Sequence, residues 1–254
     1  MQLNMAAMLE IITLVKIILA MIFLLYACVL DLRYRIVPNR LWKYMVAVLT
    51  PILVLEFVTA KYSLSTIIFS VMQFVMMFVF SYLLYSLGTY GGADAKAFIV
   101  MAYIFPVYPA VMGLPLLNKG FGIFAFSVLS NSVIVSPALL IITFIRNLRR
   151  EGLRDLKGNF LYYFVGKRVK ANSIPEFHSV LEFVDDSGKI VRVRRGIEVD
   201  EKVRKKLMKA YDEGIIDRVW VTPNLPFLLF ITAGFIISVV IGDILYLILS
   251  LILH

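Results

Sequence analysis

Cysteine is almost absent from this chain, since Cys28 is the one thiol among 254 residues. An intramolecular disulfide and a cysteine-based metal cluster are therefore both excluded. Histidine is nearly as scarce, because only His178 and His254 are present, and two histidines do not build a histidine-rich metal site. We therefore expect neither a bound metal nor a cofactor.

Charge is also sparse. Charged residues make up 17% of the chain, hydrophobic residues make up 61%, and the mean hydropathy is +0.87. Because a soluble domain is nearer one quarter charged, this balance predicts an integral membrane protein. The net charge of +9 is typical of cytoplasmic loops that face anionic lipid. Since no nucleic-acid-binding motif accompanies the charge, we expect the lipid bilayer and not nucleic acid as a partner.

Long apolar runs dominate what is present. A membrane-spanning helix needs about 20 apolar residues, and the first run is too long for the core of a signal peptide, so we expect it to be retained. Prolines within two of the runs are tolerated in membrane helices. The six expected spans cover residues 8–30, 41–60, 64–88, 95–113, 121–145 and 224–252.

The fold class that follows is an α-helical polytopic membrane protein with a small α+β cytoplasmic domain inserted before the last helix. Residues 1–145 form a five-helix membrane domain, residues 146–223 the polar domain, and residues 224–254 the sixth transmembrane helix. Nearly all of the 26 lysines and arginines follow the first, third and fifth runs, whereas Lys61 and Lys119 follow the second and fourth. Basic loops stay inside the cell. This pattern predicts a multi-pass protein of the cell membrane with both termini outside.

The polar segment carries its own signals of secondary structure. Residues 146–165 mix basic, apolar and aromatic residues, which suits a helix at the lipid surface. Alternation over 178–184 and 189–195, around a turn at 185–188, predicts a β-hairpin. Asp200 is a candidate N-cap for a helix over 201–213, and residues 217–222 suit a further strand.

Two aspartates stand at the ends of apolar runs. Asp31 follows the first run and Asp94 precedes the fourth, with two runs between them. Two crossings return the chain to its starting side, so both carboxylates should lie at the cytoplasmic membrane face. Two nearby carboxyl groups share a proton, and such a pair can activate water and protonate a peptide carbonyl. This arrangement predicts an aspartyl protease whose catalytic residues are Asp31 and Asp94.

Residues near each aspartate are candidates to support the site. Gly91 and Gly92 are expected to allow close approach of an extended substrate and positive φ beside Asp94. Lys96 could orient Asp94 or anchor at the membrane interface. Pro38 and Asn39 are expected to end the loop after Asp31 and begin the second span.

These residues also carry a family resemblance. The segment from Asp31 to Ile36-Val37-Pro38-Asn39 resembles the first active-site motif of type IV prepilin and archaeal preflagellin peptidases. Gly91-Gly92-Ala93-Asp94-Ala95-Lys96 is similar to their second motif, Gly-x-Gly-Asp-x-Lys, although Ala93 replaces its second glycine. The resemblance implies that Asp31 and Asp94 cleave the short basic leader from archaellin or pilin-like precursors. Because Cys28 cannot supply the four-cysteine zinc region of bacterial relatives, no methyltransferase activity is expected.

Alternatives remain at this point. A proton-coupled membrane transporter would also use membrane carboxylates, and a non-catalytic assembly scaffold would need neither aspartate. Within the spans, Lys16 and Glu56 lie at similar depth and are candidates for an ion pair, with Asp243 as the alternative partner of Lys16. The oligomeric state is not predicted.

Overall fold

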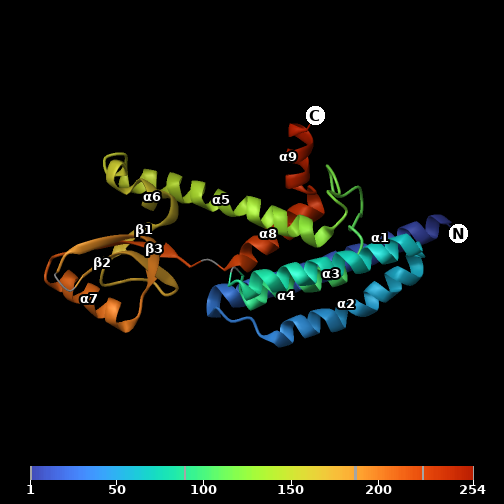
Figure 1. The fold of residues 1–254 in the computed structure, drawn as a ribbon, viewed down its shortest axis with the longest axis horizontal. Helices are drawn as coiled ribbons and strands as arrows, with labels where there is room; N and C mark the ends of the chain where they lie inside the picture. The colour runs from blue at the N-terminus through green and yellow to red at the C-terminus, as the bar shows by residue number, and fades with distance from the viewer. Residues whose placement is uncertain (1, 89, 186–187, 225, 254) are drawn as a thin grey trace. The chain divides into compact units, whose positions relative to one another are not determined.

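The computed structural model describes residues 2–88, 90–185, 188–224 and 226–253. It divides into two compact units (Figure 1). The first contains residues 1–136 and 226–254, and the second contains residues 137–225. The helices of the first unit are α1 (Gln2–Tyr34), α2 (Asn39–Ala60), α3 (Leu64–Ser86), α4 (Gly92–Ile104), the first part of α5 (Phe124–Glu151), α8 (Phe227–Val240) and α9 (Ile244–Ile252).

Membrane-capable helices account for most of the first unit. Among the described residues, the helices α1, α2, α3 and α5 are long and apolar enough to span a bilayer, and the bent pair α8 and α9 makes a fifth span if it is counted as one. Large apolar side chains are exposed along α3, including Val71, Met72 and Val79, as expected of a surface that faces lipid. The protein is therefore helical and multi-pass, but the six expected spans are not confirmed.

The observed structure differs from the expected spans at residues 95–113, where the fourth span was predicted. Helix α4 ends at Ile104, and its 13 residues are too few to cross a bilayer alone. Pro106 and Pro109 follow within five residues, and proline cannot donate the backbone hydrogen bond that would continue the helix. Tertiary packing therefore places a short buried helix where the hydropathy predicted a span.

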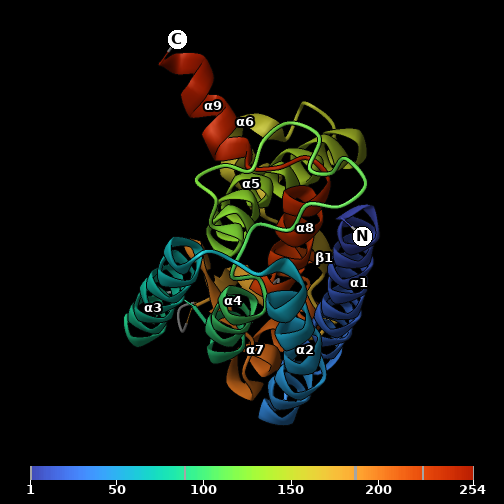
Figure 2. The ribbon, with the colours of Figure 1, turned by 90° about the vertical axis from the view of Figure 1, so that its right-hand side faces the viewer.

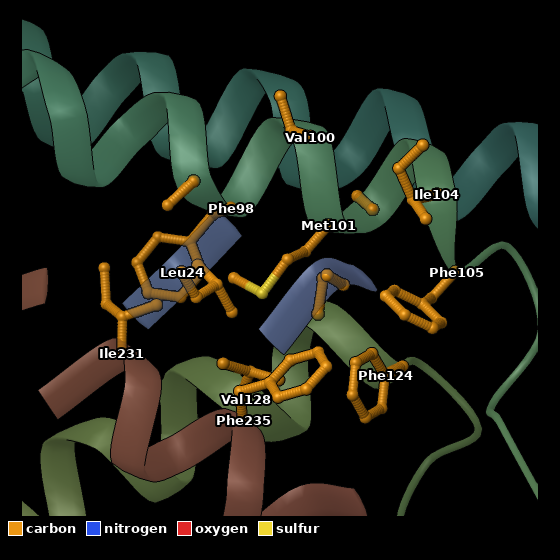
Figure 3. Close-up of a cluster of buried hydrophobic side chains, with 14 of the residues drawn as sticks. Leu24, Phe98, Val100, Met101, Ile104, Phe105, Phe124, Val128, Ile231 and Phe235 are labelled. Carbon is orange, nitrogen blue, oxygen red and sulfur yellow. The ribbon is translucent and has the colours of Figure 1, made fainter. Parts of the chain in front are cut away.

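Helix α4 lies inside the bundle, against α2, α3 and α8 (Figure 2). Its apolar residues do not form a single stripe, as expected of a helix that is buried over most of its surface. Phe98 and Met101 point toward Leu24 of α1 and Ile231 of α8, while Phe105, just after the helix, lies beside Phe124 (Figure 3). This core fixes the first turn of α4, where Asp94 lies.

The last apolar run is broken rather than continuous. Helices α8 and α9 meet at 63°, at Gly242 (φ 118°) and Asp243. The buried Asp243 carboxylate accepts hydrogen bonds from Ser127 Oγ (2.7 Å), Ser130 Oγ (3.3 Å) and the N–H of Tyr246 (3.1 Å), so it caps α9. Asp243 is thereby satisfied without Lys16, and it is not the partner of that lysine.

Lys16 of α1 instead pairs with Glu56 of α2. The two residues are 1% and 4% exposed, and the ammonium donates directly to Glu56 Oε2. Tyr62 Oη donates to Glu56 Oε1 at 3.0 Å, and the Lys16 ammonium lies 4.9 Å from the centroid of the Phe105 ring. The expected ion pair is confirmed.

The second unit is built on a four-stranded antiparallel sheet. Its strands are β1 (Lys167–Lys170), β2 (His178–Val184), β3 (Ile190–Glu198) and β4 (Arg218–Pro223), in the order β1-β4-β2-β3. Its helices are the end of α5, α6 (Leu156–Val165) and α7 (Glu201–Asp212). The hairpin, the Asp200 cap and the later strand are confirmed, while residues 186 and 187 of the expected turn lie outside the described residues.

Alternation along the strands separates two small cores. Val180, Val219 and Val221 pack with Leu207 of α7 on one face of the sheet. Leu181 and Trp220 pack on the other face with Tyr163 of α6 and Leu148 of α5. Neighbouring strand residues point to opposite faces, so the sheet is covered by a helix layer on each side.

Candidate functional site

Asp31 lies in the last turn of α1, which continues to Tyr34. The sequence predicted a loop at this point, but helical hydrogen bonding extends one turn further, and the N–H of Arg35 donates to the Asp31 carbonyl at 3.1 Å. Arg35 then adopts φ 56°, the left-handed conformation that ends a helix. The half-buried Asp31 side chain is therefore held on a helix rather than on a free loop.

Asp94 lies at the third position of α4 and is 7% exposed. Its Oδ2 accepts the N–H of Gly91 at 3.1 Å, which satisfies one of the free donors at the start of the helix. Its Oδ1 is buried and has no hydrogen-bond partner among the described residues. One carboxyl oxygen thus holds the side chain in place and leaves the other free to react.

The glycines beside Asp94 act differently from the expectation. Gly91 has φ −69°, and Gly92 is the first residue of α4, so neither takes the expected positive φ. A Cβ atom on Gly91 would lie 3.1 Å from Asp94 Oδ2, which is tighter than ordinary contact, whereas one on Gly92 would be accommodated. Ala93 packs at the edge of the core. Glycine at position 91 lets the backbone approach the Asp94 carboxylate without displacing it, whereas a side chain there would require that carboxylate to shift by a few tenths of an ångström.

The two aspartates influence each other electrostatically. Burial raises the pKa of Asp94 to about 6, the Gly91 hydrogen bond opposes this rise, and the negative charge of Asp31 adds to it. Asp31 and Asp94 are 63 residues apart in the sequence, but the fold brings them close enough for the charge of Asp31 to act on Asp94. A carboxyl group with this pKa can hold and donate a proton near neutral pH.

The two sequence motifs also meet through a hydrogen bond. Lys96 Nζ of α4 donates to Asn39 Oδ1 of α2 at 2.7 Å. Pro38, with φ −65° and ψ 139°, is the N-cap of α2, so Asn39 begins that helix as predicted. Among the described residues, Lys96 makes no hydrogen bond to Asp94; it instead ties the start of α2 to the first turns of α4.

Removing either partner of this bond should lower the stability of the bundle modestly. We expect Lys96→Met and Asn39→Ala each to cost about 1 kcal/mol of unfolding free energy, because both groups lie near solvent. The double variant should cost no more than the larger single change. Thermal unfolding of the four purified proteins in detergent measures the coupling, and additive losses would contradict the contact.

Tyr90 is a neighbour that the sequence reasoning missed. Its ring stacks on Phe227 of α8 at 4.8 Å and lies 6.0 Å from Phe98 of α4. Burial raises the pKa of Tyr90, and the charge of Asp94 raises it further. The signal available in the sequence was its position directly before Gly91. Tyr90 and its two aromatic contacts form an aromatic wall, and the Tyr90 ring lies within reach of the charge of Asp94.

Metal ligands do not gather at this site. Within the described ranges, no group of three or more His, Cys, Asp or Glu side chains is arranged to hold a metal ion. The chemistry that the described residues offer is that of two carboxyl groups, one of them tied to a glycine N–H and flanked by an aromatic wall.

Comparison with known proteins gives a consistent result. Residues 18–145 match the type IV leader peptidase family, and residues 158–244 match the archaeal peptidase A24 C-terminus, type II. The preflagellin peptidase of Methanococcus voltae is 30% identical over 227 residues, covering 87% of this chain and 92% of that protein. The preflagellin peptidase of Methanocaldococcus jannaschii is 27% identical over 237 residues, covering 90% of this chain and 94% of its own.

Both motifs, 31–39 and 91–96, fall inside the first matched region. That region spans about half of the chain, and the relatives align along most of its length. The chain belongs to the type IV leader peptidase family.

Proposed function

We propose that this protein is an aspartyl endopeptidase that removes the short basic leader from preflagellin or pilin-like precursors. The observation that carries the proposal concerns Asp94. Its Oδ1 is buried and receives no hydrogen bond from the described residues, and Asp31 lies close enough to raise its pKa. The preflagellin peptidases of two archaea supply the substrate class, because they align along most of this chain.

In the proposed mechanism, Asp31 and Asp94 divide the roles of base and acid. Ionised Asp31 takes a proton from a water molecule as the water oxygen bonds to the scissile carbonyl carbon. Protonated Asp94 donates its proton to the carbonyl oxygen, which gives a neutral tetrahedral diol and an ionised Asp94. Asp31 then gives its proton to the leaving amine as the C–N bond breaks, while ionised Asp94 takes the proton of one diol hydroxyl. The products are an amine and a carboxylic acid, and the pair again holds one proton on Asp94. The raised pKa of Asp94 suits it to the acid role.

The proposed location follows from charge. We place the site at the cytoplasmic face, residues 146–223 as a cytoplasmic domain, and both termini outside, because the basic segments lie on alternate sides of the apolar runs. This placement requires the chain to cross the bilayer between Asp94 and α5, so α4 and the segment after it, which is held by hydrogen bonds from α3 to the Pro106 carbonyl, would complete that crossing together. A precursor with a basic leader and an apolar helix then presents its scissile bond at the lipid boundary. In this arrangement the leader stays in the cytoplasm and the helix stays in the bilayer.

The direct test is cleavage of a preflagellin by the purified chain in detergent, with the cut located by mass spectrometry. We expect one cut between the basic leader and the apolar helix. Glu10→Gln is a matched control, since Glu10 is exposed on the same helix as Asp31. An intact precursor, together with solute uptake into vesicles that depends on Asp31, would favour the proton-coupled transporter instead.

The activity should depend on pH because the pair needs one proton. Since the pKa of Asp94 is raised to about 6, its proton leaves as the pH rises through that value, and kcat/KM should fall about tenfold per unit above it. On the acid side, activity should fall as Asp31 is protonated. Initial rates measured from about pH 4 to about pH 9 check both limbs, and a flat profile would contradict the shared-proton mechanism.

A further inference from the structure

One face of α5 in the second unit changes from apolar to cationic along its length. Ile142, Ile145, Arg146, Arg149 and Arg150 line a single groove. Their spacing of i, i+3, i+4, i+7 and i+8 places them on one side of a helix. Ile142 and Ile145 are 57% and 44% exposed, and the arginines follow in the next two turns. The groove therefore offers an apolar wall leading to a cluster of positive charge.

Contacts on the opposite side of α5 fix which face is turned outward. Leu148 packs against the sheet, and Asn147 Nδ2 donates to the carbonyl of Gly166 at 2.6 Å. Glu151 pairs with Arg218 at 3.2 Å and Arg168 at 3.7 Å. The acid at this end of α5 is therefore already engaged with the sheet and does not neutralise the arginines of the groove.

A fourth cation, Lys167, joins the three arginines from strand β1. Asn147 of α5 donates a hydrogen bond to the carbonyl of Gly166, and this bond fixes the next residue, Lys167, beside α5. Burial lowers the pKa of Lys167, and the charges of Arg146 and Arg150 lower it further. In the described part of the chain, no carboxylate lies at ion-pair distance from Arg146, Arg150 or Lys167.

We propose that the groove formed by Ile142, Ile145, Arg146, Arg149, Arg150 and Lys167 binds an anionic phospholipid of the surrounding bilayer. The phosphate lies between Arg146, Arg150 and Lys167, and an acyl chain lies along Ile142 and Ile145. The occupant follows from charge complementarity and from the order of the residues. Ile142 to Arg150 spans about 12 Å of helix, which matches a headgroup and the upper part of its chain. Free phosphate would make no apolar contact with Ile142 and Ile145, whereas an acyl chain would.

The test measures lipid binding by the purified full chain in neutral detergent, using native mass spectrometry with added phosphatidylglycerol or phosphatidylcholine. Near an anionic surface each basic residue is worth roughly fivefold in affinity. Wild type should therefore prefer phosphatidylglycerol, and Arg146→Gln/Arg150→Gln/Lys167→Gln should weaken its binding on the order of a hundredfold. The matched control Lys189→Gln/Lys202→Gln/Arg204→Gln removes the same charge elsewhere and should bind as wild type does.

Each other outcome decides against the assignment. If the wild-type protein binds phosphatidylglycerol and phosphatidylcholine equally well, the proposed anionic-lipid site is wrong, and no variant is needed to show it. Equal losses in the two triple variants would show only a response to net charge. Displacement of the lipid by excess inorganic phosphate would make the site one for free phosphate. Arg146→Lys/Arg150→Lys keeps the charge and should retain the lipid preference, which guards against loss by misfolding.

Discussion

Asp31→Asn and Asp94→Asn are each expected to lower kcat/KM for leader cleavage by about 10²- to 10⁴-fold, because each removes one half of an acid–base pair. Asparagine keeps the shape of the side chain but neither takes nor gives a proton in the pH range in which the enzyme would be assayed. The double variant should be no slower than the worse single variant, since two residues that act as a unit are not additive. Single-turnover cleavage of a preflagellin measures all three.

The stability of Asp94→Asn separates lost chemistry from lost folding. The pKa of Asp94 is raised from 3.8 to about 6, so the folded state holds this proton more tightly than the unfolded state does. The stability that this proton gives is fully present below pH 3.8 and is lost as the pH rises to about 6. Asparagine does not ionise and can still accept the Gly91 N–H, so it avoids this loss.

Asp94→Asn should therefore unfold at a higher temperature than wild type at pH 8, by an amount equivalent to no more than about 3 kcal/mol. At pH 4 the two proteins should unfold at nearly the same temperature. Thermal unfolding in detergent at the two pH values checks both statements. An inactive Asp94→Asn that is also less stable at pH 8 would leave the catalytic role unsupported, and an active one would refute the two-aspartate mechanism.

The controls must avoid other acids that hold the bundle together. Glu56 and Asp243 are buried, and each accepts hydrogen bonds from more than one partner, so neutral variants at these positions would destabilise the fold for reasons unrelated to chemistry. Glu10→Gln is better matched, because Glu10 is exposed on the helix that carries Asp31.

The elements that the sequence predicted well are those set by local patterns. The hairpin of β2 and β3 follows from alternation, and the Asp200 cap of α7 follows from its position before a polar helix. Helix α4 is shorter than the expected span 95–113 and is buried in protein, and hydropathy does not distinguish burial in protein from burial in lipid. The break at Asp243 depends on Ser127 and Ser130, more than 100 residues earlier.

At the candidate site, too, features set by local sequence were predictable, and features set by tertiary packing were not. The sequence singled out Asp31 and Asp94 because each interrupts an apolar pattern and lies in a motif of fixed spacing, and their catalytic role stays a prediction. The hydrogen bond from Lys96 to Asn39 was not predictable, since it joins residues 57 apart whose meeting depends on how α2 packs against α4. The role of Gly91 was misjudged because its φ of −69° follows from the start of the helix, while its lack of a Cβ serves the Asp94 carboxylate.

The buried pair of Lys16 and Glu56 gives the second large expected effect. Lys16→Met or Glu56→Gln alone should lower the free energy of unfolding by about 3–5 kcal/mol, because each leaves the opposite charge buried without its partner. The double variant Lys16→Met/Glu56→Gln should recover most of that loss, since two neutral side chains carry little desolvation cost. Unfolding in detergent, followed by temperature or denaturant, compares the four proteins.

A charge-swapped variant adds a sharper comparison. Lys16→Glu/Glu56→Lys restores opposite charges but places a carboxylate beside the Phe105 ring and an ammonium beside the Tyr62 hydroxyl, so rescue should be partial. If the two single losses simply add in the double variant and the swap rescues nothing, the pair contributes no coupling. The pair lies roughly 22 Å along α1 from Asp31. Variants that remain folded should therefore cleave at nearly the wild-type rate, which separates support of the bundle from chemistry at the aspartates.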